Sequence, residues 1–293
     1  MTITPTTMRR VLVTGGNGQL GEAICRAAEG SAHRYTFATI DELNICNRAD
    51  VERYIAENEI DTIINCAAYT DVEGAEDNIN MAYAINSTAV ASLAEVCKRL
   101  NVRLIHISTD YVFGGDSERS TPYTESDTTA PLNIYGRSKA EGEVAVIEHD
   151  GIVIRTSWLY APWGKNFVLT MLRLGKERDE ISVVDDQRGT PTSALGLARA
   201  IVLMVDTDAI DAMRGIYHYT DGGECTWHDF ACEIMQQAGL ACRVEPCATK
   251  EHNMRAERPA YSVLDTARIT AIKGIDIAPW QERLKEVISL INR

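Results

Sequence analysis

The segment Tyr135-Gly136-Arg137-Ser138-Lys139 separates a phenol from an amine by four positions. In a helix this spacing places both side chains on one face. A phenol with a pKa of about 10 is a poor acid or base at neutral pH, and a nearby ammonium group favours its ionised form. The pair can therefore deliver a proton to a carbonyl oxygen. Such a pair also occurs by chance on exposed helical faces, so the chemistry needs support from other residues.

A group of polar residues, Ser108-Thr109-Asp110-Tyr111, directly follows an apolar run that is predicted to be a strand. The hydroxyl group of Thr109 can donate a hydrogen bond to the same carbonyl oxygen. Ligands of parallel-sheet proteins bind at the carboxyl ends of the strands. We therefore expect Thr109, the Tyr135 helix and the glycine turn described next to meet at one edge of a sheet.

The glycine-rich stretch Thr14-Gly15-Gly16-Asn17-Gly18-Gln19-Leu20-Gly21 follows the predicted strand 9–14 and opens a predicted helix. Its glycines permit a tight turn, a close approach of the backbone to a pyrophosphate, and close packing of helix on strand. The strand–turn–helix setting favours a dinucleotide site. A glycine turn that serves only tight packing is the alternative.

The choice between NADH and NADPH depends on the end of the second strand, where an acid normally binds the adenosine ribose. Thr39 stands at this position, with Asp41 and Glu42 just beyond it. The missing acid removes a repulsion of the NADPH 2′-phosphate, but no arginine stands beside Thr39 to attract that group. Both cofactors therefore remain open at this point.

The elements around these motifs alternate between short apolar strands and helices. This order predicts a parallel sheet covered on both faces, a doubly wound α/β fold of the Rossmann type. The expected strands are 9–14, 34–38, 61–65, 103–108, 152–155, 181–184 and 215–219, and the expected helices lie at 19–28, 49–58, 79–100, 135–149, 166–176, 194–205, 226–238 and 280–293. We expect a cofactor domain over residues 1–156, joined by parts of 190–220, and mainly a smaller α/β substrate-binding lobe over 157–293.

The composition limits the classes of partner. The 293-residue chain has 45% hydrophobic and 24% charged residues, which is typical of a soluble globular enzyme. A formal net charge of −13 argues against a nucleic-acid or acidic-membrane surface. No apolar run approaches the roughly 20 residues of a membrane span, and residues 1–8 lack the apolar stretch of a signal peptide. We expect a cytoplasmic protein.

The eight cysteines and six histidines form no pattern typical of a metal site. No C-x-x-C pair occurs, and most of the cysteines stand in apolar segments. We expect small, buried, reduced thiols and assign no metal ligand. Scattered disulfides are the alternative.

Together these motifs resemble the extended short-chain dehydrogenase/reductase superfamily, and within it the dTDP-4-dehydrorhamnose reductase family. The resemblance runs from residue 9 to the end of the chain. It is carried by residues 15–21, 65–70, 108–113, 131–139, 155–160, 186–192 and 258–259. The family reduces the 4-keto group of dTDP-4-dehydro-β-L-rhamnose to give dTDP-L-rhamnose, with NADPH or NADH as the hydride donor.

The resemblance implies roles for individual residues. Tyr135 is the expected proton donor, Lys139 lowers its pKa and holds the nicotinamide ribose, Thr109 binds the carbonyl, and Asn86 supports this site. The expected cofactor-binding residues are Gly15, Asn17, Gly18, Gln19, Leu20, Gly21, Thr39, Asn44, Ile45, Cys66, Ala67, Ala68, Tyr69, Tyr135 and Lys139, with Asn65 bordering the cofactor. The expected substrate-binding residues are Thr109, Tyr111, Trp158, Asn166, Gln187, Pro191 and Arg258. Trp158 could instead belong to the core, and Arg258 to a surface turn.

Three alternatives are compatible with the same motifs. Sugar-nucleotide dehydratases of the superfamily carry a glutamate where this chain has Tyr111, which favours reduction over dehydration. Another sugar-nucleotide reductase or an epimerase remains open. One related branch is a non-catalytic, dinucleotide-binding regulatory subunit of methionine adenosyltransferase, although the presence of Thr109, Tyr135 and Lys139 favours an enzyme. The resemblance also allows a homodimer and Mg²⁺ at acidic residues in a dimer contact, but no compact acidic motif identifies such a site.

Overall fold

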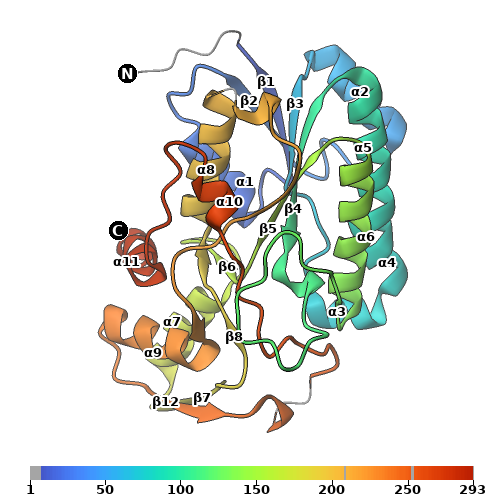
Figure 1. Ribbon diagram of the computed structural model, residues 1–293. Helices are drawn as coiled ribbons and strands as arrows, with labels where there is room; N and C mark the ends of the chain where they lie inside the picture. The colour runs from blue at the N-terminus through green and yellow to red at the C-terminus, as the bar shows by residue number, and fades with distance from the viewer. Residues whose placement is uncertain (1–7, 208, 252–253, 293) are drawn as a thin grey trace.

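The computed structural model describes residues 8–207, 209–251 and 254–292. The lead-in over 1–7 and residue 293 of the last expected helix lie outside the described residues. Six parallel strands form the central sheet in the order β2-β1-β3-β4-β5-β10 (Figure 1). These strands are β1 (Arg10–Thr14), β2 (Arg34–Ala38), β3 (Thr62–Asn65), β4 (Arg103–Thr109), β5 (Ile152–Thr156) and β10 (Gly215–His218). The expected doubly wound α/β class is confirmed.

Helices cover both faces of the sheet because successive side chains of each strand point to opposite sides. Val11 and Val13 of β1 belong to the core on the side of α1 and α8, whereas Leu12 belongs to the core on the side of α2, α5 and α6. Figure 1 shows these two helical layers on either side of the strands. The helices are α1 (Gln19–Ala27) and α8 (Ala194–Asp206) on the first side, and α2 (Arg48–Asn58), α5 (Ala89–Leu100) and α6 (Ile134–Glu148) on the second.

The prediction of a single continuous helix over 79–100 is wrong, because the segment is interrupted. The segment is divided into α4 (Ile79–Tyr83), a π-helical turn (Ala84–Thr88) and α5, and a short helix α3 (Val72–Asp77) precedes it. One widened turn hardly changes the spacing of apolar residues, so the sequence pattern does not reveal it. The π-helical turn carries the buried Asn86, whose contacts are described below.

The second lobe is built from short elements after β5. Its strands are β6 (Leu159–Tyr160), β7 (Glu180–Val184), β8 (Arg188–Gly189), β9 (Thr192–Ser193), β11 (Cys225–Thr226) and β12 (Arg243–Cys247), and its helices are α7 (Phe167–Glu177), α9 (Trp227–Ala238) and α11 (Trp280–Ile291). The short helix α10 (Ala267–Thr270) lies against β10 of the central sheet. The 3-10 turns lie at Asp110–Val112, Ala209–Asp211 and Thr249–Glu251. Strand β12, which pairs in parallel with β7, was not expected from the sequence.

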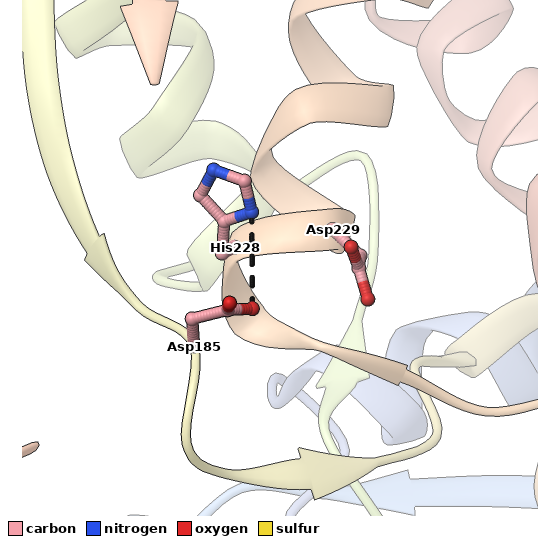
Figure 2. Close-up of side chains that lie close together, drawn as sticks. All are labelled: Asp185, His228 and Asp229. Carbon is pink, nitrogen blue, oxygen red and sulfur yellow. Dashed lines mark ion pairs between the residues drawn. The ribbon is translucent and has the colours of Figure 1, made fainter. Parts of the chain in front are cut away.

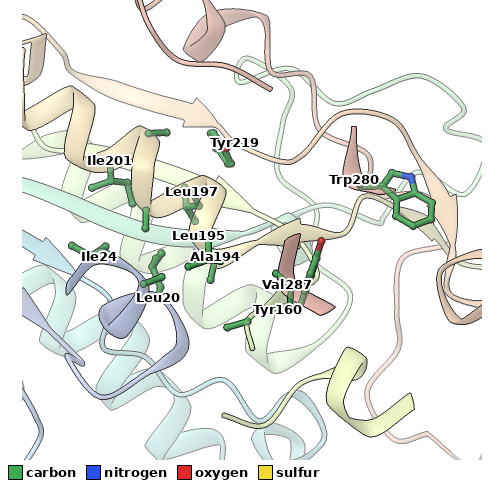
Figure 3. Close-up of a cluster of buried hydrophobic side chains, with 14 of the residues drawn as sticks. Leu20, Ile24, Tyr160, Ala194, Leu195, Leu197, Ile201, Tyr219, Trp280 and Val287 are labelled. Carbon is green, nitrogen blue, oxygen red and sulfur yellow. The ribbon is translucent and has the colours of Figure 1, made fainter. Parts of the chain in front are cut away.

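One hydrophobic core joins the two halves of the molecule. Leu20 of α1 and Ile201 of α8 belong to the same buried cluster as Trp280 and Val287 of α11 (Figure 3). Because interiors are packed closely, a cluster that crosses from the sheet into the lobe holds their relative position.

None of the eight cysteines, all of which lie in the described part of the chain, is joined in a disulfide. The expectation that they are mostly buried is wrong for Cys25, Cys46 and Cys232, which are exposed. A cysteine in an apolar stretch of helix can still point outward, because only one face of the helix is covered. Among the described residues, the helices are too short or too polar to cross a lipid bilayer.

Candidate active site

A cavity of about 680 Å³ lies at the carboxyl ends of the parallel strands. The loops that follow β1, β3, β4 and β5 all contribute to its wall, which is the usual ligand position in a doubly wound sheet. The residues of the sequence prediction that line it are Gly15, Asn17, Gly18, Gln19, Leu20, Gly21, Asn44, Ile45, Cys66, Ala67, Ala68, Thr109, Tyr135, Lys139 and Trp158. The three expected catalytic side chains and the glycine turn thus face one space.

The glycine turn packs so closely that two of its positions have no room for a side chain. Gly15 has a φ of +64°, and a Cβ atom there would lie 2.9 Å from the backbone nitrogen of Ala67. A Cβ atom on Gly21 would lie 2.4 Å from the carbonyl oxygen of Gly15. Helix α1 begins after Gly18 without a side-chain cap, so its first backbone N–H groups have no side-chain acceptor. Such a helix start suits the pyrophosphate of a dinucleotide.

Two asparagines position the helix that carries Tyr135 and Lys139. Asn133 is the N-cap of α6, since its side chain accepts a hydrogen bond of 2.8 Å from the Gly136 amide. Asn86 donates to the hydroxyl of Ser138 over 3.1 Å and also bonds both backbone groups of Tyr69. Asn86 therefore links α6 to the loop after β3, which borders the same cavity.

Lys139 is buried, and its amine donates hydrogen bonds to the carbonyl oxygen of Ile107 (2.6 Å) and to the ring of His106 (3.2 Å). Burial lowers the pKa of Lys139 to about 8, and the carboxylate of Glu143 opposes this change. Burial raises the pKa of Tyr135, and the Thr109 hydroxyl opposes that rise. The hydroxyl group of Thr109 is therefore a neighbour that lowers the pKa of Tyr135.

A second cavity of about 470 Å³ contains two other expected substrate-binding residues, Gln187 and Arg258. Tyr111 connects it to the catalytic residues, because its ring lies edge-on to that of Tyr135 with centroids 5.8 Å apart. Burial raises the pKa of Tyr111 to about 12, and the guanidinium of Arg258 opposes this rise. Arg258 also pairs with Glu73 over 2.8 Å.

Seven expected residues do not line the first cavity. Of these, Gln187 and Arg258 line the second cavity, and the other five line neither. The amide and hydroxyl of Thr39 are both bonded to Glu42, at 2.8 and 3.0 Å. Asn166 is the N-cap of α7 and donates to Gln19 Oε1 over 2.8 Å. The remaining members of this group are Tyr69, Tyr111 and Pro191. The backbone of Tyr69 is bonded by Asn86, and Tyr111 contacts Tyr135 and Arg258. Pro191 lies between β8 and β9.

The comparison with known families agrees with this arrangement. The sequence model for the RmlD substrate binding domain matches residues 8–292. The chain belongs to this family. It is the family of the dTDP-4-dehydrorhamnose reductases, within the extended short-chain dehydrogenase/reductase superfamily.

Individual members differ in their names. The Bacillus subtilis (strain 168) spore coat polysaccharide biosynthesis protein SpsK is 37% identical over 96% of this chain and 97% of its own length. The crystal structure of a dTDP-4-dehydrorhamnose reductase from Clostridium acetobutylicum is 39% identical, with a TM-score of 0.91 over 97% of this chain and 100% of that one. A Bacillus anthracis dTDP-4-dehydrorhamnose reductase in complex with NADP is 36% identical, with a TM-score of 0.90 over the same shares.

Several lining residues of this RmlD-family cavity were not expected from the sequence. Ser108 and Thr156 end neighbouring strands, and their place at the carboxyl edge of the sheet is a signal that could have identified them. Lys165 has no such signal, because it precedes α7 in a chain segment that returns to the cavity from the second lobe. Met81 and Ile85 reach the cavity from α4 and the π-helical turn, within the segment that was expected to be one continuous helix.

A group with potential metal ligands lies outside the cavity, between the end of β7 and the start of α9. Figure 2 shows Asp185, His228 and Asp229, whose ligand atoms lie within 4.8 Å of one another. The structure already employs both carboxylates: Asp185 accepts from the Thr226 hydroxyl at 2.7 Å, and Asp229 accepts from the Thr226 amide at 3.0 Å as part of a capping box. These contacts account for the group as the N-terminal cap of α9, so we assign no metal to it.

Proposed function

We propose that this protein reduces the 4-keto group of dTDP-4-dehydro-β-L-rhamnose to give dTDP-L-rhamnose, with NADPH or NADH as the reductant. The observation that carries the proposal is the convergence of Thr109, Tyr135 and Lys139 with the glycine turn on one cavity. The Clostridium acetobutylicum and Bacillus anthracis relatives, both named dTDP-4-dehydrorhamnose reductases, support it.

The residues present fit a nicotinamide dinucleotide. Gly15 and Gly21 allow the turn to pack closely on neighbouring backbone, where a Cβ atom would collide, and this turn and the uncapped start of α1 line the cavity. Asn44 and Ile45 at one end, and Lys139 at the other, would hold the two halves of the cofactor. Bound NAD(P)H supplies the hydride for the reduction.

The protein supplies the proton and the stabilisation of charge. Tyr135 would donate its phenolic proton to the oxygen that develops negative charge as the carbonyl is reduced. The Thr109 hydroxyl, which donates to Asp110 in this structure, would turn to donate a hydrogen bond to the same oxygen. Each donor aimed at that oxygen contributes on the order of 3 kcal/mol. The Lys139 ammonium would favour the phenolate left on Tyr135, because an opposite charge stabilises the ionised form.

The substrate would extend from the first cavity to the second. Trp158 lines the first cavity, where its apolar ring would contact the sugar. Gln187 and Arg258 line the second, where a guanidinium suits a diphosphate. We propose residues 1–156 with the segment that forms α8 and β10 as the cofactor-binding part, and 157–293 mainly as the substrate-binding part.

The decisive experiment measures oxidation of NADH and of NADPH by the purified protein against a panel of 4-keto sugar nucleotides. We expect turnover that depends on dTDP-4-dehydrorhamnose and is faster with it than with UDP-linked or other 4-keto sugars. The relative named SpsK makes this panel necessary. Faster turnover of another sugar nucleotide would change the substrate. Dinucleotide binding without any turnover, together with a cellular role that survives Tyr135→Phe, would favour the non-catalytic alternative.

A further inference from the structure

Four buried polar side chains form a continuous chain beneath the active site. Thr14 Oγ1 lies 2.6 Å from the side-chain amide of Asn65, that amide lies 2.9 Å from His106 Nδ1, and His106 Nε2 lies 3.2 Å from Lys139 Nζ. The exposed fraction of each of the four residues is 1% or less. The reductase chemistry proposed above uses Lys139 but assigns no task to the other three.

The register of the sheet produces this chain. Thr14 of β1 pairs with Asn65 of β3, and Asn65 pairs with His106 of β4. Two residues earlier, the same three strands align an apolar row of Leu12, Ile63 and Leu104, which are all buried in the core beneath α5 and α6. A polar row thus replaces an apolar one on a face that is shielded from water. Burying polar groups is unfavourable unless each finds a partner.

The available protons fix the state of the histidine. An ammonium group has only donors, so His106 Nε2 must accept from Lys139, and the ring proton of neutral His106 must then be on Nδ1. Nδ1–H needs an acceptor, which the oxygen of the Asn65 amide provides when the amide is turned so that its NH₂ group donates to Thr14 Oγ1. The two ends of an amide have the same shape, so this assignment keeps the same distances. Every group of the row then has a partner.

The surroundings keep this state. Burial, followed by the charge of Lys139, holds the pKa of His106 well below its usual range, so the ring stays neutral. The charged or titratable groups that face Lys139 are Glu143 on its own helix, the Cys66 thiol after β3, and His106 on β4. Glu143 itself is paired with Arg155 at 2.6 Å, which keeps its carboxylate away from a direct bond to the lysine.

We propose that His106, in its neutral Nδ1–H form, is a positioning residue for Lys139, and that the row Thr14–Asn65–His106 fixes the lysine relative to the glycine turn. This inference rests on the proposed reductase function. His106 and the Ile107 carbonyl accept two of the three N–H groups of the ammonium, which leaves the third for the cavity. Thr14 directly precedes Gly15, so one row of side chains positions both the cofactor turn and the lysine.

The first test reads the histidine directly and needs no substrate. Nitrogen-15 NMR of the histidine-labelled full-length protein, with His106→Gln used to assign the signal, is expected to show an Nδ1–H ring that does not titrate across neutral pH. A signal of the Nε2–H form, or one that becomes protonated near the ordinary histidine pKa, would overturn the proposal. In the Lys139→Met variant the histidine ring no longer accepts from an ammonium, so we expect its signal to lose the strong preference for the Nδ1–H form.

The second test uses two variants of the intact protein in the NAD(P)H oxidation assay. His106→Phe fills the site without an acceptor, and we expect kcat to fall about 10- to 100-fold, the range for a hydrogen bond to a charged group, with little change in the KM for the sugar nucleotide. The decrease of kcat/KM at high pH should begin at a lower pH in His106→Phe than in wild type, because the Lys139 ammonium loses an acceptor that favours its charged form. His106→Gln retains an oxygen acceptor and should recover most of the rate.

These outcomes separate the two proposals. If the wild-type protein turns over no 4-keto sugar nucleotide, the proposed function fails while the NMR result still decides the state of His106. If His106→Phe keeps the wild-type rate and pH profile, or if His106→Gln is as impaired as His106→Phe while both remain folded, His106 does not position Lys139.

Discussion

The indole ring of Trp158 stacks on that of Trp227, with ring centroids 3.6 Å apart and planes 10° from parallel. Trp158 lines the first cavity, which the glycine turn also lines, whereas Trp227 is the first residue of α9 in the second lobe. Trp158 also has a φ of +45°, a left-handed conformation that non-glycine residues rarely adopt and that is often found at binding sites. The lobe therefore holds in place a side chain that belongs to the proposed substrate site.

Replacing Trp227 should weaken substrate binding without affecting the chemical step. Trp227→Leu removes the stacked ring, which contributes about 0.5–1.5 kcal/mol beyond its buried area. We expect the KM for the sugar nucleotide to rise about 2- to 10-fold with kcat nearly unchanged. Trp227→Phe, which keeps an aromatic face, is the matched control and should lie close to wild type. Equal KM values for Leu and wild type would show that the stacking does not position Trp158.

Removing the Tyr135 hydroxyl should abolish most of the proton transfer. Tyr135→Phe keeps the ring against Tyr111 but has no proton to donate, so we expect kcat to fall about 100-fold or more, with the affinity for NAD(P)H little changed. Stopped-flow or steady-state oxidation measures the rate, and fluorescence titration measures the affinity. Tyr54→Phe on α2, at a residue that does not line the cavity, makes the same chemical change as a control. A Tyr135→Phe variant with near-normal kcat would falsify the assigned role.

The activity should fall as the pH rises through the pKa of Lys139. Burial lowers that pKa to about 8, so the amine is charged below this pH and neutral above it. Since the ammonium is the form that stabilises the Tyr135 phenolate, kcat/KM should decrease above about pH 8. Lys139→Arg, whose guanidinium stays protonated, should be less active but should lack this decrease. If kcat/KM of Lys139→Arg decreases above pH 8 as it does in wild type, the decrease must come from another titrating group.

The apolar runs predicted the strands of the central sheet well, because buried parallel strands are apolar on both faces. The glycine turn and the Tyr135–Lys139 pair were also accessible, since each is local in sequence. The row Thr14–Asn65–His106 was not, because its members belong to three different strands and only their register aligns them.

The second lobe was harder to predict for a related reason. Its strands β6, β8, β9 and β11 have two residues each, too few for any periodicity to be visible. Asn166 shows the same limit at a single position: the resemblance implied a place near the sugar, and the structure adds that its side chain caps α7, which the sequence did not indicate. A capping residue and a ligand-binding residue have the same amino-acid type, and only the fold distinguishes them.

Glu42 should bias the protein toward NADH. Its carboxylate binds the amide and hydroxyl of Thr39, the position next to which the adenosine ribose is expected, and these bonds lower its pKa so that it stays charged. Its neighbours Ile40 and Leu43 line the cavity. A negative charge at this corner disfavours a 2′-phosphate.

The matched change is Glu42→Gln, which retains an oxygen acceptor for Thr39 but removes the charge. We expect the ratio of the KM for NADPH to that for NADH to fall about 2- to 5-fold, the size of an exposed charge interaction, and the effect to shrink at high salt. Steady-state titration of both cofactors at fixed sugar nucleotide measures it. An unchanged ratio would mean that Glu42 serves only to shape the turn after β2.

Asp110 should make the stability of the protein depend on pH. Its carboxyl group is 2% exposed, and burial raises its pKa to about 7, although bonds from Ser262 (2.6 Å) and Thr109 (3.1 Å) oppose this. In the unfolded chain the group ionises near pH 4. Between these two values folding must keep a proton that the unfolded chain has lost, so the wild-type protein loses stability as the pH rises from about 4 to 7, by at most about 1.4 kcal/mol per pH unit.

Asp110→Asn cannot ionise and removes this dependence. The free energy of unfolding of the variant relative to wild type, from urea titrations without cofactor, should therefore increase with pH across this window and level off above about pH 7. Ser262→Ala removes a hydrogen bond that favours the carboxylate, so it should raise the pKa of Asp110 further and extend the loss of stability to higher pH. A difference between Asp110→Asn and wild type that stays constant from pH 4 to 7 would mean that the buried carboxyl group ionises as readily in the folded protein as in the unfolded chain.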